Sequence, residues 1–364
     1  MNCCVSIQPI LDGLAGRQTA ALARAISLVE NGAPGFEDLL AAIHGSLGRS
    51  RRIGVTGPPG GGKSTLVERL TAAYREAGLT VGVVAVDPSS PFTGGALLGD
   101  RIRMERNSLD PGVFIRSMAS RGSLGGMATT TGEVADIMDA FGFDRILIET
   151  VGVGQSELDV ATAADTTLVV LVPESGDGIQ VMKAGLMEIA DVLVVNKADR
   201  PGADRLRQEL EVAIGLRSGQ VYRHVRAHHG VALKGDGGTE GPRDRTPPLV
   251  FGPPVPRSPG PPDWEPPVLA TSAADSTGVG ELVAALDRHF QHLERTDQLA
   301  GRRKKRLEIR TREVVDRAVR RWIWSSDAQV VEVESALKDV TAGLKSPYEA
   351  AAGIVAKLLG GVGV

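Results

Sequence analysis

A glycine-rich segment between an apolar run and a helical pattern constrains the fold of this chain more than any other feature. It follows the run 53–55, precedes a helical pattern that begins at Thr65, and matches the pattern G-x-x-x-x-G-K-[ST]. Its residues are Gly57, Pro58, Pro59, Gly60, Gly61, Gly62, Lys63 and Ser64. Such a loop turns backbone N–H groups toward an anion at a helix N-terminus, while the lysine reaches the β and γ phosphates and the hydroxyl binds magnesium. We therefore expect these residues and Thr65 to hold a nucleotide.

Short apolar runs alternate with helical stretches on both sides of this loop. The runs cover 53–56, 81–86, 113–115, 146–149, 167–172 and 192–196, and a further run covers 268–271. Runs that are apolar at successive positions suit strands buried on both faces of a parallel sheet. The pattern predicts an α/β fold of the P-loop NTPase type, with a mostly parallel sheet flanked by helices.

Helical extensions are expected before and after this domain. Apolar residues at helical spacing between 15 and 50 predict two helices joined by a turn at 31–35. Toward the other end, a basic helical segment at 302–306 leads into 314–324, and a final helix covers 347–359. We therefore divide the chain into an N-terminal extension (1–50), a nucleotide-binding domain (51–295) and a C-terminal helical region (296–364).

A proline-rich stretch interrupts the strand and helix pattern. Eleven of the 21 prolines lie between Pro242 and Pro267, and this density is incompatible with a regular element. We expect a flexible surface insertion over about 216–265. The pair His228 and His229 within it is more typical of a solvated loop than of a metal site.

Composition excludes several functional classes. The net charge of −3 leaves no electrostatic footprint for nucleic acid or for an anionic membrane. No apolar run reaches the ~18 residues that span a bilayer. The adjacent cysteines Cys3 and Cys4 cannot staple a core. Since the first residues also lack the pattern of a signal peptide, we expect a cytoplasmic protein.

A second motif predicts which base is bound. Asn196, Lys197 and Asp199 form N-K-x-D at the end of an apolar run. A carboxylate there can accept from N1–H and from the 2-amino group of guanine, whereas adenine offers an acceptor at N1 and no 2-amino donor. Ser272 and Ala273, after the next run, would complete the site if their backbone N–H groups meet the guanine carbonyl oxygen, and Ala274 is also expected to contact the nucleotide. Together with the phosphate loop, the motif predicts guanine nucleotides.

Acidic residues that follow the apolar runs are candidate magnesium ligands, because this ion prefers oxygen donors. Glu149 closes one run, Asp87 ends another, and Asp100 lies in a glycine-containing stretch thirteen residues later. With Ser64 they form the predicted metal site. A helix cap would also account for Asp87, and a surface charge for Asp100. Gly152 would let the backbone approach the γ phosphate.

Longer motifs make a family resemblance visible. They are VDPSSPFTGGALLGDRIRM (86–104), SMASRGSLGG (117–126), ETVGVGQSE (149–157), GDGIQVMKAGLMEIADVLVVNKAD (176–199) and WEPPVLATSA (264–273). The chain resembles the G-protein chaperones of adenosylcobalamin-dependent acyl-CoA mutases, the MeaB/ArgK/MMAA family, over about residues 15–360.

The resemblance implies a GTPase that works as a homodimer through its C-terminal helices. It implies a mutase partner, most simply methylmalonyl-CoA mutase, whose loading with adenosylcobalamin from an adenosyltransferase the GTPase gates and which it protects or reactivates. The adenosylcobalamin would belong to the mutase, whereas the chain itself would bind GTP, GDP and Mg²⁺. Carried over residue by residue, it implies Ser64, Asp87, Asp100 and Glu149 at the magnesium. Lys183 would be a switch lysine, catalytic together with Lys63 and Glu149.

Several alternatives stay open at this point. Lys183 could be a solvated helix lysine, and the proline-rich stretch departs from the short segment usual in the family. A metallochaperone GTPase would need cysteine or histidine ligands near the switches, and a transport-associated ATPase or kinase would need to use ATP. A binding module without hydrolysis would keep the same motifs. The apolar positions 314, 315, 318, 322 and 323 could pack against a second copy or within one chain.

Overall fold

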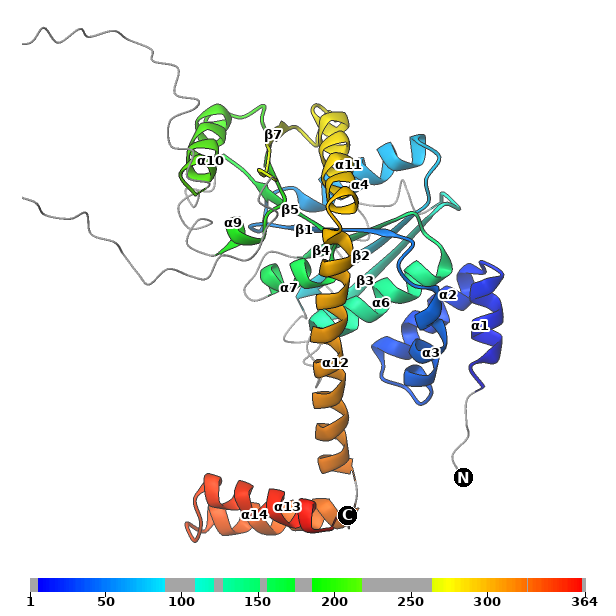
Figure 1. Ribbon diagram of the computed structural model, residues 1–364, viewed down its shortest axis with the longest axis vertical. Coiled ribbons are helices and arrows are strands. Elements are labelled where there is room, and N and C mark those ends of the chain that lie inside the picture. The colour runs from blue at the N-terminus through cyan, green and yellow to red at the C-terminus, as the bar shows by residue number, and fades with distance from the viewer. Residues whose placement is uncertain are drawn as a thin grey trace, which may run out of the picture.

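A seven-stranded, wholly parallel sheet forms the centre of the computed structural model (Figure 1). The structure describes residues 6–88, 109–120, 127–150, 156–173, 185–217, 264–325 and 327–361. The strands are β1 (Arg51–Thr56), β2 (Val81–Pro88), β3 (Val113–Ser120), β4 (Arg145–Thr150), β5 (Thr166–Leu171), β6 (Val192–Asn196) and β7 (Val268–Thr271). Their order across the sheet is β3-β2-β4-β1-β5-β6-β7. The predicted α/β fold with a parallel sheet is confirmed.

Strand β1 lies between β4 and β5 and pairs in parallel with both. Ile53 pairs with Leu147 of β4 on one side and with Thr166 of β5 on the other. From β1 the chain continues to β2 on one side of the sheet and later returns to form β5 on the other side. The loop after β1 therefore lies at the carboxyl ends of the strands, at the point where the direction of the connections reverses. Parallel sheets bind ligands in such a crevice.

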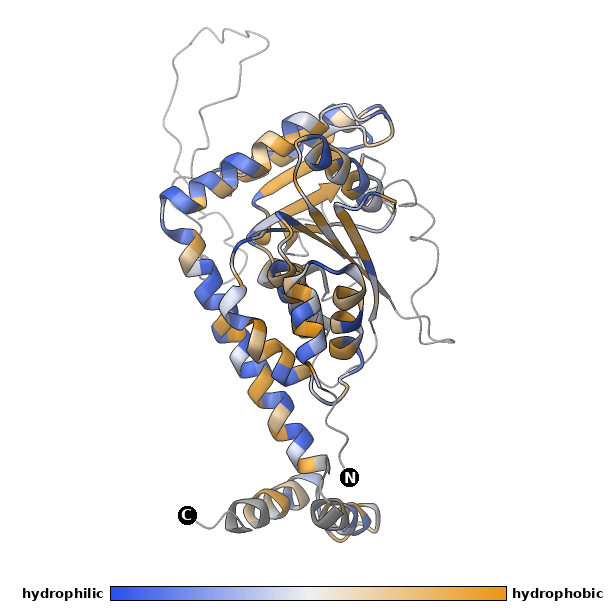
Figure 2. Ribbon diagram, turned by 90° about the vertical axis from the view of Figure 1, so that its right-hand side faces the viewer, coloured by the Kyte–Doolittle hydropathy of each residue, from blue (hydrophilic) through white to orange (hydrophobic). Residues whose placement is uncertain are grey.

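Helices cover both faces of the sheet, which explains why the strands are apolar at successive positions. On one face α4 (Lys63–Glu76) and α11 (Val279–Arg295) pack on Val55, Val83 and Leu147. On the other face α6 (Met127–Phe141) and α7 (Ser156–Ala163) pack on Ile146 and Ile148. Figure 2 shows the strands as the apolar layer between these helices. Alternate residues of each strand thus fill two separate cores.

Beside the last strands, α9 (Leu186–Ile189) and α10 (Ala203–Arg217) enclose a third apolar cluster. It contains Val169, Leu193 and Leu210. Trp264, just before β7, donates its indole N–H to the carbonyl of Asp191 at 2.9 Å. That bond joins the start of β6 to the segment that re-enters the sheet after residue 263.

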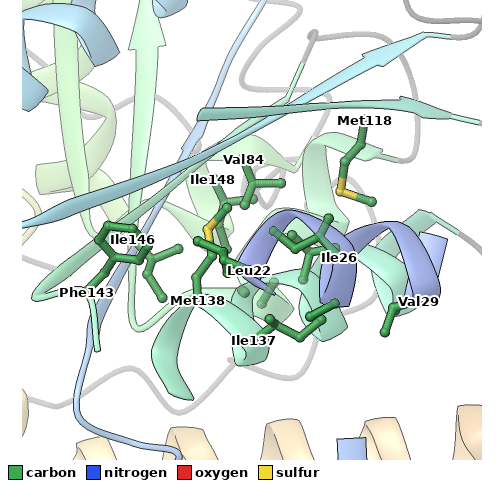
Figure 3. Close-up of a cluster of buried hydrophobic side chains, with 14 of the residues drawn as sticks. Leu22, Ile26, Val29, Val84, Met118, Ile137, Met138, Phe143, Ile146 and Ile148 are labelled. Carbon is green, nitrogen blue, oxygen red and sulfur yellow. The ribbon is translucent and has the colours of Figure 1, made fainter. Parts of the chain in front are cut away.

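The N-terminal extension packs on α6. Helices α2 (Thr19–Glu30) and α3 (Phe36–Ile43) are the two predicted helices, and Gly35 makes the turn between them at φ 93°. Figure 3 shows Leu22 and Ile26 of α2 against Met138 of α6 and the sheet residue Ile148. A further helix, α1 (Gln8–Ala15), was not predicted, and a short 3₁₀ turn (His44–Ser46) follows α3. The extension therefore shares one continuous core with the nucleotide domain.

Strand β3 is longer than the predicted run 113–115, because polar residues continue it. Arg116 within β3 pairs with Glu30 of α2, so a charged residue occupies a strand position with a partner provided by the N-terminal extension. An apolar pattern cannot anticipate such a residue. The other predicted runs differ from the observed strands by at most a few residues at their ends.

The C-terminal region consists of three helices, α12 (Gln298–Ser325), α13 (Asp327–Thr341) and α14 (Pro347–Gly361). The basic segment and the run 314–324 form one continuous helix, and α13 was not predicted. Figure 1 shows α12 continuing from α11 past α6 to α13 and α14, which pack on each other beyond the rest of the molecule. None of the helices that the structure describes is both long and apolar enough to cross a membrane.

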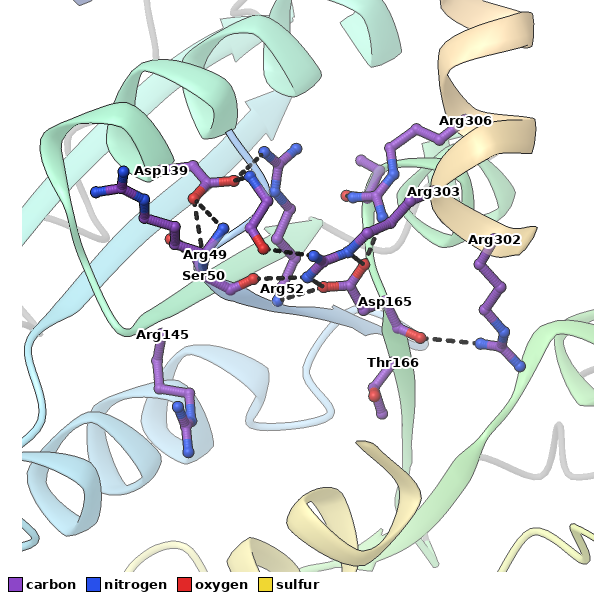
Figure 4. A network of polar contacts seen from close by, with 12 residues as sticks. Arg49, Ser50, Arg52, Asp139, Arg145, Asp165, Thr166, Arg302, Arg303 and Arg306 are labelled. Atoms are coloured by element: carbon purple, nitrogen blue, oxygen red, sulfur yellow. Dashed lines mark hydrogen bonds and ion pairs between the residues drawn. The ribbon is translucent and has the colours of Figure 1, made fainter. Parts of the chain in front are cut away.

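Arginines of α12 bind aspartates at the amino ends of the strands, and Figure 4 shows those around Asp165. Arg303 and Arg306 both contact the carboxylate of Asp165, which directly precedes β5. Arg302 donates to both carboxylate oxygens of Asp191, directly before β6, at 2.8 Å each. We call these five residues the arginine clamp. It attaches α12 to the edge of the sheet opposite the P-loop.

The clamp keeps both aspartates ionised although they are buried. Burial alone raises the pKa of Asp165, but the charge of Arg306 and the hydrogen bond from Arg303 lower it to about 2. Burial likewise opposes ionisation of Asp191, and hydrogen bonds from Arg302 and His289 lower its pKa to about 2. Ion pairs of this kind stabilise the folded state only while the carboxylates carry their charge.

Candidate functional site

The glycine-rich loop joins β1 to α4, and two of its glycines are required by its geometry. Gly57 has φ 135°, and a Cβ there would lie 2.0 Å from the carbonyl oxygen of Val170 in β5. Gly62, the residue before α4, has φ 79°, and a Cβ there would lie 2.5 Å from the side-chain nitrogen of Asn196. The loop can therefore lie this close to β5 and β6 only without side chains at these positions.

Lys63 begins α4 and folds back over the loop. Its side chain is buried, and Nζ donates to the carbonyl oxygens of Gly57 at 2.8 Å and Pro58 at 2.9 Å. The ammonium group thus lies beside the loop at the N-terminus of a helix, where the helix dipole adds further positive potential. Backbone amides, dipole and lysine together form an anion site of the kind that phosphate requires.

Ser64 and Glu149 meet beside this loop. The Ser64 hydroxyl donates to Oε1 of Glu149 at 2.6 Å, and Glu149 is buried near the end of β4. Strand pairing sets Glu149 opposite Val55 of β1 and Ala85 of β2. A hydroxyl and a carboxylate in contact are both hard oxygen donors, so this pair fits a magnesium ion with further water ligands.

Asp87 follows Ala85 on β2, at the same edge of the sheet as Glu149. The structure describes its backbone but not its side chain. Of the other predicted residues, Asp100, Gly152 and Lys183 lie outside the described residues, as do positions 218–263 of the proline-rich stretch. The structure accordingly brings Ser64 and Glu149 together and leaves the roles of the others as predictions.

Asn196, at the end of β6, connects the phosphate loop to the loop after β7. Its Nδ2 donates to the carbonyl of Gly61 at 2.9 Å. Its Oδ1 accepts from the amide of Ala273 at 3.1 Å and from the hydroxyl of Thr271 at 3.2 Å. The side chain is buried, and both its nitrogen and its oxygen are hydrogen-bonded to other parts of the protein. Asn196 therefore holds together the loops that we predict to contact the nucleotide.

The rest of the N-K-x-D motif lies at the same edge. Lys197 adopts a left-handed backbone conformation at φ 56°, and the amide of Ala198 donates to the carbonyl of Thr271 at 2.9 Å. Asp199 follows and is exposed. Ser272 is held by its amide, which donates to Thr277 at 3.0 Å. Two separate stretches of sequence, 196–199 and 272–274, are thereby brought side by side next to the phosphate loop.

Arg69 is a contact of this region that the motifs did not predict. From α4 its Nε donates to the carbonyl of Ala273 at 2.9 Å, and its Nη2 donates to the carbonyl of Ala274 at 3.0 Å. In the sequence, an arginine at this helical position is indistinguishable from one on a solvated face. Only the tertiary structure, which brings the loop after β7 to α4, shows its partners.

Comparisons with known proteins show which family the sequence matches. The sequence model described as "Methylmalonyl Co-A mutase-associated GTPase MeaB" matches residues 22–328. A protein of Pyrococcus abyssi named as a GTPase is 40% identical over 355 residues, which cover 98% of each chain. The mouse protein "Methylmalonic aciduria type A homolog, mitochondrial" is 39% identical over 236 residues, 60% of this chain and 57% of the mouse protein.

Among solved structures, a protein described as an LAO/AO transport system kinase has a TM-score of 0.60 and 25% sequence identity to this chain. The match covers 97% of each chain. The similarity thus extends beyond the nucleotide domain to the flanking helices.

Proposed function

The chain belongs to the MeaB family of methylmalonyl-CoA mutase-associated GTPases, and we propose that it is a chaperone of an adenosylcobalamin-dependent acyl-CoA mutase. It is a P-loop GTPase, which converts GTP to GDP and phosphate. The proposed client is methylmalonyl-CoA mutase, named in the description of the family. In this role the GTPase gates the loading of adenosylcobalamin and protects or reactivates the mutase.

The observation that carries the nucleotide part of the proposal is the position of Asn196. Its bond to Gly61 sets the N-K-x-D motif directly against the phosphate loop, so one bound nucleotide can reach both. Asp199 then accepts from guanine N1–H and from the 2-amino group. The amides of Ser272 and Ala273, expected to face the base, instead donate to Thr277 and Asn196, so the amides that follow them face the guanine O6 atom. Asp199 is exposed in the free chain, so a base that covers it without offering the 2-amino donor would leave it buried and unmatched, which costs roughly 1–3 kcal/mol.

Within the proposed site, Lys63 holds the β and γ phosphates, and Ser64 with Glu149 holds magnesium. The Ser64–Glu149 contact of 2.6 Å supports this pairing, and Asp87 and Asp100 complete the oxygen ligands. A magnesium ion bound there would neutralise charge on the phosphates during transfer. The protein's own part is to orient the nucleotide: Lys63 would fix the γ phosphate, Gly152 would allow a close approach to it, and Lys183 would act as the switch lysine that responds to the partner.

Two further partners belong to the proposal. The adenosyltransferase would deliver the cofactor that the GTPase gates. A second copy of the chain would pack on the C-terminal helices, where Val315, Val319 and Trp322 of α12 are each about half exposed. Side chains of this kind at helical spacing are typical of a helix with an apolar face toward a partner.

The direct test combines nucleotide choice with the partner. The purified protein should bind GTP and GDP at least 100-fold more tightly than ATP and ADP, the order expected when a buried polar site is mismatched. Its slow hydrolysis of GTP should accelerate when a cobalamin-dependent mutase is added, because the isolated site is incomplete. Equal binding of ATP would contradict the guanine site, and no complex with any such mutase would contradict the chaperone role.

The similar solved structure is described as a transport system kinase, and this suggests a second candidate function, that of a transport-associated kinase. Such a protein would use ATP and pass its phosphate to another protein. Incubation with γ-labelled ATP and GTP separates the two: release of inorganic phosphate from GTP supports the GTPase chaperone, whereas labelled protein formed from ATP supports the kinase. The position of N-K-x-D against the phosphate loop favours the first outcome.

A further inference from the structure

Arg69 joins the helix that starts at the phosphate loop to the loop that follows β7. It lies in the second turn of α4, which begins at Lys63. Its guanidinium donates to the carbonyls of Ala273 and Ala274 at 2.9 and 3.0 Å, 204 and 205 positions further along the chain. Two successive carbonyl oxygens of the loop are thus held by one planar group.

Holding these oxygens sets the direction of the loop's amides. In a planar trans peptide unit, the carbonyl oxygen and the N–H of the next residue point in opposite directions. With the oxygens of Ala273 and Ala274 bound to α4, the N–H groups of Ala274 and Asp275 are turned away from α4. A fork of parallel donors fixes such an orientation better than a single donor, because it restrains both peptide planes at once.

The other hydrogen bonds of this loop hold its two ends together but do not restrain its tip. The amide of Ser272 donates to Thr277 at 3.0 Å, and Asp275 Oδ1 accepts from the amide of Thr277 at 3.0 Å. Gly278 closes the loop at φ 75°, where a Cβ would lie 2.3 Å from the carbonyl of Ala270. Ala274, between these bonds, is exposed. Arg69 therefore acts at the part of the loop that its own closing bonds leave least restrained.

The contact also adds a second connection between the phosphate loop and the loop after β7, which we call the base loop (272–275). Ala273 donates to Asn196, and Asn196 donates to Gly61 of the phosphate loop. From Gly61 the chain continues through Lys63 into α4 and back to Arg69. Any shift of α4 relative to the phosphates is accordingly passed to the base loop through two separate connections.

We infer that Arg69 is a positioning residue for guanine recognition, which orients the amides at 274 and 275 toward the guanine O6 atom. The inference rests on the proposed guanine site at 196–199 and 272–274. It adds a residue from outside both motifs and explains how a helix that binds phosphate also sets the geometry of the base loop.

The test compares Arg69→Ala with the natural protein. Losing two hydrogen bonds from a charged donor should weaken GDP binding about tenfold, the equivalent of 1.4 kcal/mol. The KM for GTP should rise by a similar factor, while kcat changes less than threefold, because Arg69 touches neither phosphate nor water in this proposal. Arg69→Lys, which keeps the charge and one donor direction, should recover part of the affinity.

A nucleotide modified at O6 separates positioning from general stability. In 6-thio-GDP, sulfur replaces O6 and accepts hydrogen bonds poorly, so the natural protein should bind it more weakly than GDP. In Arg69→Ala that penalty should shrink at least threefold, since the amides no longer point at the atom. The matched control is Arg75→Ala in the same helix, whose guanidinium binds Asp110 at 2.9 Å. Arg75→Ala should leave the thio penalty, which is the loss of affinity for 6-thio-GDP relative to GDP, the same as in the natural protein.

The outcomes distinguish the inference from the function on which it rests. If the natural protein prefers GDP to ADP, and Arg69→Ala keeps both the GDP affinity and the thio penalty, the positioning role is wrong while the guanine site stands. If the natural protein binds ADP as well as GDP, the guanine site itself is wrong. Thermal unfolding monitored by circular dichroism identifies a variant that merely fails to fold, and Arg69→Lys then carries the same comparison.

Discussion

The carboxyl edge and the amino edge of the sheet differ in the kinds of residue that line them. At the carboxyl edge, backbone groups and small residues dominate: Gly57 and Gly62 sit where side chains cannot fit, and Ala274 is exposed. At the amino edge, long charged side chains dominate, and the buried Asp165 and Asp191 bind arginines of α12. The glycine-rich loop therefore lies at the carboxyl edge of the sheet, and the arginine clamp lies at its amino edge.

This difference indicates which edge stabilises the fold and which edge is suited to bind a ligand. Charges at the amino edge are matched by partners within the chain, and this arrangement fixes α12 to the sheet. The carboxyl edge concentrates amides, Lys63 and carboxylates around a loop, an arrangement that suits a charged ligand from outside. We expect substitutions at the amino edge to alter stability and substitutions at the carboxyl edge to alter catalysis, and the following predictions test this division.

The largest effect is expected from Asp165→Ala. It removes the buried carboxylate that the partly buried guanidinium groups of Arg303 and Arg306 contact, which should lower the free energy of unfolding by about 3–5 kcal/mol. Urea unfolding followed by circular dichroism measures the loss. GDP affinity of the variant at low temperature, where it remains folded, should match the natural protein. A loss below about 1 kcal/mol would contradict the structural role of the clamp.

At the opposite edge, Lys63→Ala should lower GTP turnover by about 10²–10³-fold, the scale of losing one preorganised charge-stabilising group. The melting temperature should change little, since the bonds described above join the ammonium to carbonyls of its own loop. Phosphate release measures turnover. Lys304→Ala, an exposed lysine of α12, is the control with unchanged turnover. Retained hydrolysis in Lys63→Ala would remove the phosphate role.

Acid should protonate the clamp aspartates only after most other carboxylates, and the stability that the clamp provides should be lost as the pH falls. Asp165 and Asp191 have pKa values of about 2 in the folded chain against an ordinary 3.8. Because these pKa values are lowered by folding, their stabilisation is complete above about pH 4 and disappears as the pH falls toward 2. Each carboxylate accounts for roughly 2 kcal/mol of this loss. Unfolding free energy measured from pH 5 to pH 2 should fall less steeply in Asp165→Asn than in the natural protein.

The smallest effect is expected where α12 has left the sheet edge. Arg321 and Glu37 of α3 form an ion pair at 3.0 Å, with side chains 47% and 53% exposed. Solvent screens such a pair, so Glu37→Ala should cost about 1 kcal/mol or less. Melting temperatures at low and high salt measure it, and the difference should vanish at high salt. A loss as large as that of Asp165→Ala would mean that this exposed pair holds α12 as firmly as the buried carboxylate of the clamp does.

Much of the fold was predictable because it depends on local patterns. The runs at 81–86 and 192–196 were recognisable as buried strands from their composition alone, and the glycine motif located the loop between β1 and α4. Two failures differ in their causes. Helix α13 was overlooked although Val333, Leu337 and Val340 recur at helical spacing. Strand β3 continues through Arg116, whose partner Glu30 belongs to a distant helix. A charged residue is expected to be exposed until its partner is known.

The candidate site divides in the same way. Lys63, Ser64 and Glu149 were predicted from motifs, and the structure brings Ser64 into contact with Glu149. Asn196 was predicted as a nucleotide residue, and the structure shows its bonds joining two loops. Arg69 was not predicted, because its contacts lie 204 and 205 residues away in sequence and no short motif contains them.

The sequence by itself determined the parallel α/β fold, the phosphate loop and the guanine motif, because backbone conformation and contiguous residue types specify them locally. Only the tertiary structure decided which edge carries the arginine clamp, how Asn196 links the loops, and that Arg69 reaches the loop after β7. Those contacts depend on pairing between residues far apart in the chain, and an arginine on a helix looks the same in sequence whether it faces water or a carbonyl. Packing of α4 and α12 against the sheet supplied the partners.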